Sequence, residues 1–82
     1  MPTTQDDIRG WLERGKARGA SHMLVVCDTF DWSDYPVFVM PGEDARKRAA
    51  ENSGPNMTKL MEVYNLAEDW DQQLNQVRSF NY

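Results

Sequence analysis

The feature that most constrains the fold is a pair of short apolar runs on either side of a polar loop, between Met23 and Met40. The runs are rich in β-branched and aromatic residues, so they predict strands at residues 21–28 and 35–40 that pair as an antiparallel hairpin. Both faces of the first run are apolar, which indicates a central strand that is covered at least partly on both sides. Pro36 has no backbone N–H, so it is expected at the start of the second strand or on an edge.

Helical patterns lie on both sides of the hairpin. Capping hydroxyls, an acidic first turn and apolar residues at helical spacing predict a first helix over residues 4–18. An alanine-rich pattern predicts a second helix over residues 43–52. A last helix is expected from about residue 67, with an apolar stripe formed by Trp70, Leu74 and Val77.

Residues 58–66 fit either a helix or a strand. We predict a strand at residues 60–66, because a hairpin alone is rarely stable without a third strand. Simple alternation would then place Leu60 and Tyr64 on one face and Met61 and Val63 on the other. The chain is thus predicted to be one domain, residues 1–82, of the α+β class. Its order is α-β-β-α-β-α, with a small three-stranded antiparallel sheet and helices mainly on one face.

Length and charge narrow the classes of function. The chain has 82 residues, with 13 aspartates and glutamates against 9 lysines and arginines, and a net charge of −4. This balance argues against direct binding to nucleic acid, which needs a basic face. It fits a basic partner protein, or it serves solubility alone. The longest apolar run is too short to span a membrane, and the first residues do not resemble a signal peptide.

A single cysteine, Cys27, lies within the first predicted strand, so no internal disulfide is expected. The one histidine, His22, is five residues away on the same strand and should point to the opposite face. Cys27 is therefore predicted to be a small buried side chain without a catalytic role.

The loop of the hairpin carries the candidate binding residues. Asp28, Asp31 and Asp34 lie among three aromatic residues, Phe30, Trp32 and Tyr35, and of these rings Trp32 and Tyr35 are included in the predicted site. Large rings and like charges are unusual at a loop that only has to turn the chain, and aromatic residues are common in binding hot spots. We predict a partner-binding surface here, with further acid supplied by Glu68, Asp69 and Asp71.

Each of these residues also has a purely structural interpretation. The carboxylates can cap turns and keep the loop solvated, and Trp32 can fold back over the sheet. The spacing of the three aspartates does not match a calcium-binding EF-hand loop, which needs a central glycine and a distal glutamate. Asp28 and Asp31 are also one residue too far apart for the Asp-x-Asp of haloacid dehalogenase phosphatases. No metal, cofactor or catalytic set is predicted, so we expect no enzymatic activity.

Three blocks of the sequence, ASHMLVVCDTFDWSDYPVFV, MPGEDAR and MEVYNLAEDWDQQLNQVRSFNY, resemble short proteins encoded by phages and by prophage regions of bacteria. Small acidic phage proteins of this kind include anti-CRISPR inhibitors. The resemblance implies an inhibitor in the bacterial cytoplasm that occupies a site where a host effector complex would otherwise bind DNA. The partner would then be a basic protein or nucleoprotein complex. The alternative is a small-ligand or regulatory binding domain that uses the loop and sheet as a pocket.

Overall fold

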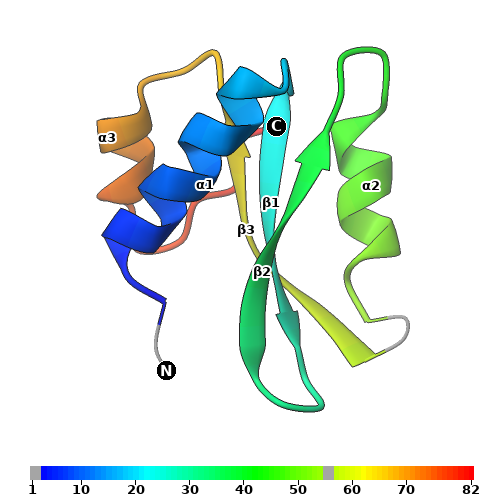
Figure 1. Ribbon diagram of the computed structural model, residues 1–82. Coiled ribbons are helices and arrows are strands. Elements are labelled where there is room, and N and C mark those ends of the chain that lie inside the picture. Colours follow the sequence, from blue (N-terminus) through cyan, green and yellow to red (C-terminus); the bar gives the residue numbers. More distant parts are fainter. Residues whose placement is uncertain (1–2, 55–56) are drawn as a thin grey trace.

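The computed structural model describes residues 3–54 and 57–82, which form a small α+β fold. The predicted order of elements, α-β-β-α-β-α, is confirmed. The predicted third strand is also confirmed, although it begins two residues earlier than expected. Figure 1 shows α1 (Gln5–Ala17), β1 (His22–Asp28), β2 (Ser33–Val39), α2 (Ala45–Glu51), β3 (Thr58–Asn65) and α3 (Trp70–Leu74).

The three strands form an antiparallel sheet in the order β2-β1-β3. The central position of β1 agrees with its sequence, since residues 23–27 are all buried. Pro36 lies on the edge strand β2, where a missing N–H costs no bond to a further strand. In the register, Asp28 pairs with Ser33 on one side and with Thr58 on the other, so the β1–β2 turn lies next to the start of β3.

Helices lie on both faces of the sheet: α1 and α3 share one face, in line with the expectation of helices mainly on one face, and α2 covers the other. In Figure 1 the strands lie between α1 and α3 on one side and α2 on the other. Ile8 and Leu12 of α1 pack with Met23 and Val25, whereas Ala49 of α2 packs with the opposite face of the sheet. The small alanine side chains let α2 lie close to the strands, so even this weakly apolar helix can cover the second face of β1.

A β-bulge in β3 corrects the predicted assignment of its faces. The pairing with β1 shifts between Val25 and Val26, whose partners are Glu62 and Leu60, so Met61 is the extra residue. Leu60 therefore packs in the same cluster as Val63, and Met61 packs against the cluster that contains Tyr64. Simple alternation along the strand instead groups Leu60 with Tyr64 and Met61 with Val63, because it does not allow for an inserted residue.

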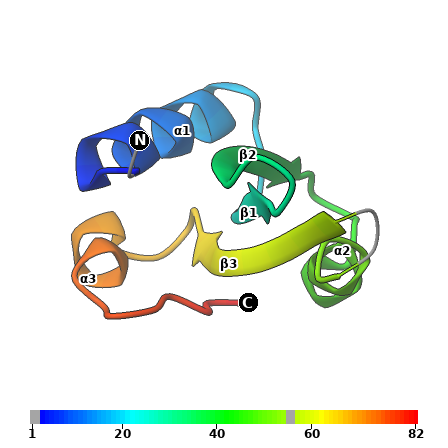
Figure 2. The same ribbon diagram turned by 90° about the horizontal axis from the view of Figure 1, so that it is seen from below.

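The last helix is shorter than its apolar pattern indicates. It ends at Leu74, so Val77 lies beyond it and is fully exposed. Buried Gln73 completes the packing instead, by bonding both the backbone N–H and the backbone carbonyl of Asn65. The chain then returns along β3, where Val63 forms a parallel bridge with Phe80 (Figure 2). Backbone pairing thus anchors the tail, while the ring of Phe80 stays 45% exposed.

Candidate functional site

The turn between β1 and β2 presents two large aromatic side chains to solvent. Phe30 is 79% exposed and Trp32 is 69% exposed, so Trp32 does not fold back over the sheet. The backbone N–H of Trp32 donates to the carbonyl of Asp28 at 2.6 Å, which closes the turn. Trp32 takes a φ of 60°, a left-handed conformation that large side chains rarely adopt. The turn therefore holds an indole in the solvent at a conformational cost of about 1–3 kcal/mol.

Asp28 and Asp31 stabilise this turn and still offer charge to the outside. One oxygen of Asp28 accepts the backbone N–H of Phe30 at 2.9 Å, and one oxygen of Asp31 accepts that of Ser33 at 3.0 Å. These bonds agree with the structural interpretation of the two carboxylates. Among the described residues, neither carboxylate is paired with a basic side chain. Both interpretations therefore apply together, because each aspartate shapes the loop and keeps an oxygen available.

Met57 adds a third exposed apolar side chain at the same end of the sheet. It is 53% exposed and also has a left-handed backbone, with a φ of 63°. Its carbonyl accepts both the backbone N–H and the hydroxyl of Thr29, at 2.8 and 2.9 Å. We refer to residues 28–33 together with Met57 as the hairpin tip. No periodic pattern in the sequence points to Met57, and Phe30 was not among the predicted binding residues although it lies within the loop.

Asp34 and Tyr35, which were predicted to belong to the binding surface, lie on β2 rather than in the loop. Asp34 is half-buried and accepts the hydroxyl of Thr3 at 2.7 Å. Tyr35 is half-buried and packs against the cluster that contains Leu24 and Val26. Because β2 begins at Ser33, both residues belong to the half-buried part of the sheet and not to the exposed tip.

Cys27 lies just behind the hairpin tip, on β1, and is only 5% exposed. Burial raises the pKa of its thiol, and the neighbouring Asp34 carboxylate raises that pKa further. A thiol in these surroundings stays protonated and is a weak nucleophile. The prediction that Cys27 is a buried side chain is confirmed.

The second predicted acidic group lies at the opposite end of the sheet. Glu68, Asp69 and Asp71 follow the end of β3, near Ser21, whose carbonyl accepts the N–H of Leu66 at 3.0 Å. The hairpin tip lies at the other end of β1, a strand of seven residues that spans roughly 20 Å. The structure therefore does not bring the two acidic groups into one site (Figure 1).

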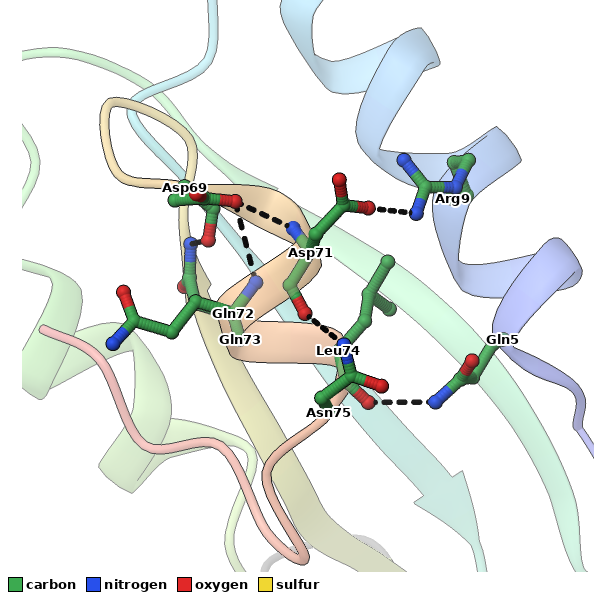
Figure 3. A network of polar contacts seen from close by, with 8 residues as sticks. All are labelled: Gln5, Arg9, Asp69, Asp71, Gln72, Gln73, Leu74 and Asn75. Atoms are coloured by element: carbon green, nitrogen blue, oxygen red, sulfur yellow. Dashed lines mark hydrogen bonds and ion pairs between the residues drawn. The ribbon is translucent and has the colours of Figure 1, made fainter.

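Two carboxylates of this second group are engaged within the protein (Figure 3). Asp69 caps α3 by accepting the backbone N–H groups of Asp71 and Gln72, at 2.9 and 3.2 Å. Asp71 pairs with Arg9 of α1, and this hydrogen bond raises the pKa of the guanidinium. Asp69 thus caps α3, in line with the structural interpretation of these carboxylates, and the ion pair between Asp71 and Arg9 joins α3 to α1.

A hollow of about 700 Å³ lies at this second end, between the end of α1 and the turn after β3. The hydroxyl oxygen of Ser21 lies 2.9 Å from Nδ1 of His22, while Nε2 of His22 is buried without a hydrogen-bond partner among the described residues. The ammonium group of Lys16 lies over the ring of Trp70, 5.9 Å from its centre. The hollow is open and its lining mixes apolar, basic and acidic groups, including Glu68.

The described part of the chain shows neither a metal-binding cluster nor a membrane-spanning helix. Within residues 3–54 and 57–82, no three or more histidine, cysteine, aspartate or glutamate side chains are placed together so as to hold a metal ion. No helix in these ranges has the length and apolar character needed to cross a membrane. Comparisons of the chain with protein-family models, with curated proteins and with solved structures find no match. The geometry of the hairpin tip is therefore the main structural basis for a function.

Proposed function

We propose that the protein is a small inhibitor that binds through the hairpin tip to a basic groove on a partner protein. The observation that carries this proposal is the exposure of Phe30 and Trp32 beside two carboxylates that, within residues 3–54 and 57–82, have no basic partner. A soluble protein gains nothing in stability from rings held in water, and exposed apolar patches commonly mark interaction surfaces. The carboxylates give such a surface its preference for a positively charged partner.

The partner we propose is a bacterial effector complex whose basic groove otherwise binds DNA. The sequence resemblance to phage-encoded proteins supports this class of partner, and the charge of the tip supports this kind of groove. Carboxylates at the tip would lie where DNA phosphates lie, and the rings would pack against the walls of the groove. In this role the protein acts by occupancy, like an anti-CRISPR inhibitor, and performs no chemical reaction.

Competition with DNA tests this proposal. The partner is captured from a bacterial lysate on the immobilised protein, identified and purified, and then bound to a labelled DNA fragment. The parent protein should displace the DNA, and its association should slow as salt rises, because the Debye length falls from about 10 Å at 0.1 M to about 3 Å at 1 M. Failure to displace DNA at any concentration would refute the inhibitory role.

Matched variants assign the contact surface. Asp28→Asn with Asp31→Asn removes two charges and keeps the oxygen that accepts each backbone N–H, so the turn should survive. Glu68→Gln removes an exposed charge at the opposite end and serves as the control. We expect the tip variant and Trp32→Ala to compete poorly and the control to compete like the parent. If the control weakens competition instead, the contact surface lies at the second end.

The alternative function, binding of a small ligand, would involve the hollow at the second end of the sheet. That hollow contains Lys16 and the buried, unpartnered Nε2 of His22. Substitutions at Lys16 would affect such binding and leave the hairpin tip unchanged. The two functions are therefore separable by mutation. The tip is favoured because it is exposed and projects from the sheet, whereas a ligand site should enclose its occupant.

A further inference from the structure

In the part of the chain that the structure describes, aromatic rings are contacted by basic side chains in three places. The guanidinium of Arg46 lies over Tyr82, 4.3 Å from the ring centre, and that of Arg18 lies over Phe38 at 5.0 Å. A lysine makes the third and longest contact, at 5.9 Å. The arginines thus approach the rings more closely, as expected for a planar and weakly hydrated group that can stack on an aromatic face.

Among the described residues, no cation contacts the aromatic rings of the hairpin tip. Phe30 and Trp32 are the most exposed aromatic side chains among the described residues, and within those residues no basic group lies over either ring. Ion pairing follows the same division. The ion pairs in the described part of the chain all use arginine and none involves the tip; they are Arg9–Asp71, Arg48–Glu43 and Arg48–Glu51.

We propose that the hairpin tip binds arginine side chains on the surface of the partner protein, in preference to lysine. This inference rests on the proposed function and names the chemistry of its contact. A guanidinium can stack on the indole of Trp32 and donate two N–H groups to the neighbouring carboxylate of Asp31, which has no basic partner among the described residues. A lysine ammonium is a compact, strongly hydrated charge and satisfies only the electrostatic part of such a contact.

Two synthetic peptides of equal length and charge test this preference without the natural partner. One alternates glycine with arginine, and the other alternates glycine with lysine. Each is titrated into the isotope-labelled full chain while nuclear magnetic resonance follows the backbone amides of residues 28–33 and the indole N–H of Trp32. We expect both peptides to shift these signals, with the lysine peptide binding about two- to fivefold more weakly, which is the range expected of one exposed cation–π contact.

Two variants separate stacking from charge. Trp32→Leu keeps an apolar side chain and removes the indole face, so the difference in affinity between the two peptides should narrow, while the bidentate contact with Asp31 stays possible. Asp31→Asn should weaken both peptides, and Glu68→Gln at the opposite end should weaken neither. Each variant is first compared with the parent by circular dichroism and by its amide spectrum, so that a loss of fold is recognised.

The outcomes distinguish this inference from the proposed function. Equal affinity of the parent for the two peptides at the tip would overturn the arginine preference and leave an acidic binding tip intact. If the peptides shift only amide signals at the second end of the sheet, the inference is also overturned, because the peptides then bind the carboxylates at that end and not the hairpin tip. Failure of the parent to displace DNA from the captured partner concerns the proposed function alone. In that case a clear arginine preference at the tip would still stand as a property of the surface.

Discussion

Two glycines of α1 provide a test of how closely this helix packs on the sheet. Gly10 and Gly15 both lie within the helix, so replacing either by alanine should stabilise the helical conformation by about 1 kcal/mol. The two positions differ in their surroundings. A methyl group at Gly10 would meet no atom within 4 Å, whereas one at Gly15 would lie 3.0 Å from two ring carbons of Phe38 and 3.3 Å from a methyl carbon of Leu66.

Two different side chains crowd the position, so both Phe38 and Leu66 have to move before a methyl group at Gly15 fits without strain. The guanidinium of Arg18 lies over the ring of Phe38 and further restricts its displacement. Overpacking of this kind costs about 1–3 kcal/mol, which offsets or exceeds the gain in helix propensity. We therefore expect Gly10→Ala to stabilise the protein by about 0.5–1 kcal/mol and Gly15→Ala to be neutral or to destabilise it by up to about 2 kcal/mol.

Urea titrations of the parent and the two variants, followed by circular dichroism, measure this difference. The dependence of the free energy on urea should be the same for all three proteins, so the shift in midpoint reports stability alone. The expected gap between the variants is about 1–3 kcal/mol. If Gly15→Ala gains as much stability as Gly10→Ala, then α1 does not lie close enough to Phe38 of β2 for a methyl group at Gly15 to clash, and the reasoning from close packing is refuted.

Three further predictions follow from burial. Leu74→Ala should lower the free energy of unfolding, measured by urea titration, by about 2–5 kcal/mol because Leu74 is buried. Val77→Ala should change that free energy by less than about 0.5 kcal/mol, and equal effects of the two substitutions would mean that α3 extends further. Burial and the nearby Glu62 raise the pKa of Tyr64, so the unfolded chain loses this proton first, and stability should fall above about pH 10 in the parent more than in Tyr64→Phe. Cys27 should react with a thiol reagent far more slowly in native protein than in denaturant, and equal rates would contradict its burial.

The sequence predicts the two ends of α1 well because the signals are local. Thr4 and Asp7 form a capping box, in which each side chain accepts the backbone N–H of the other residue. The buried positions of the helix then follow from spacing alone, and Ile8, Leu12 and Gly15 are all buried as their pattern indicates. Such features depend on residues within one or two turns, so no knowledge of the tertiary structure is needed.

The candidate site was predicted only in part, for reasons that lie outside any local pattern. Asp31 and Trp32 lie in the exposed turn as expected, whereas Asp28 is half-buried at the end of β1. Met57 joins the tip because β3, which begins at the next residue, pairs with β1. Whether an acidic residue remains available also depends on distant contacts. Asp71, for example, is paired with Arg9, which lies 62 positions earlier in the chain. The sequence shows which residues are acidic, but it does not show where they lie in the folded protein or which of them are paired with a basic residue.

The order of the elements and the central place of β1 can be predicted from the chain alone, because hydrophobic periodicity and apolar content are local properties of each segment. Three features follow only from the folded arrangement: which helix covers which face, which residues of β3 share a face after the bulge at Met61, and the position of the two acidic groups at opposite ends of the sheet. These properties arise from contacts between segments far apart in sequence. Their energies depend on the shape of the space that the other elements leave, which no single segment encodes.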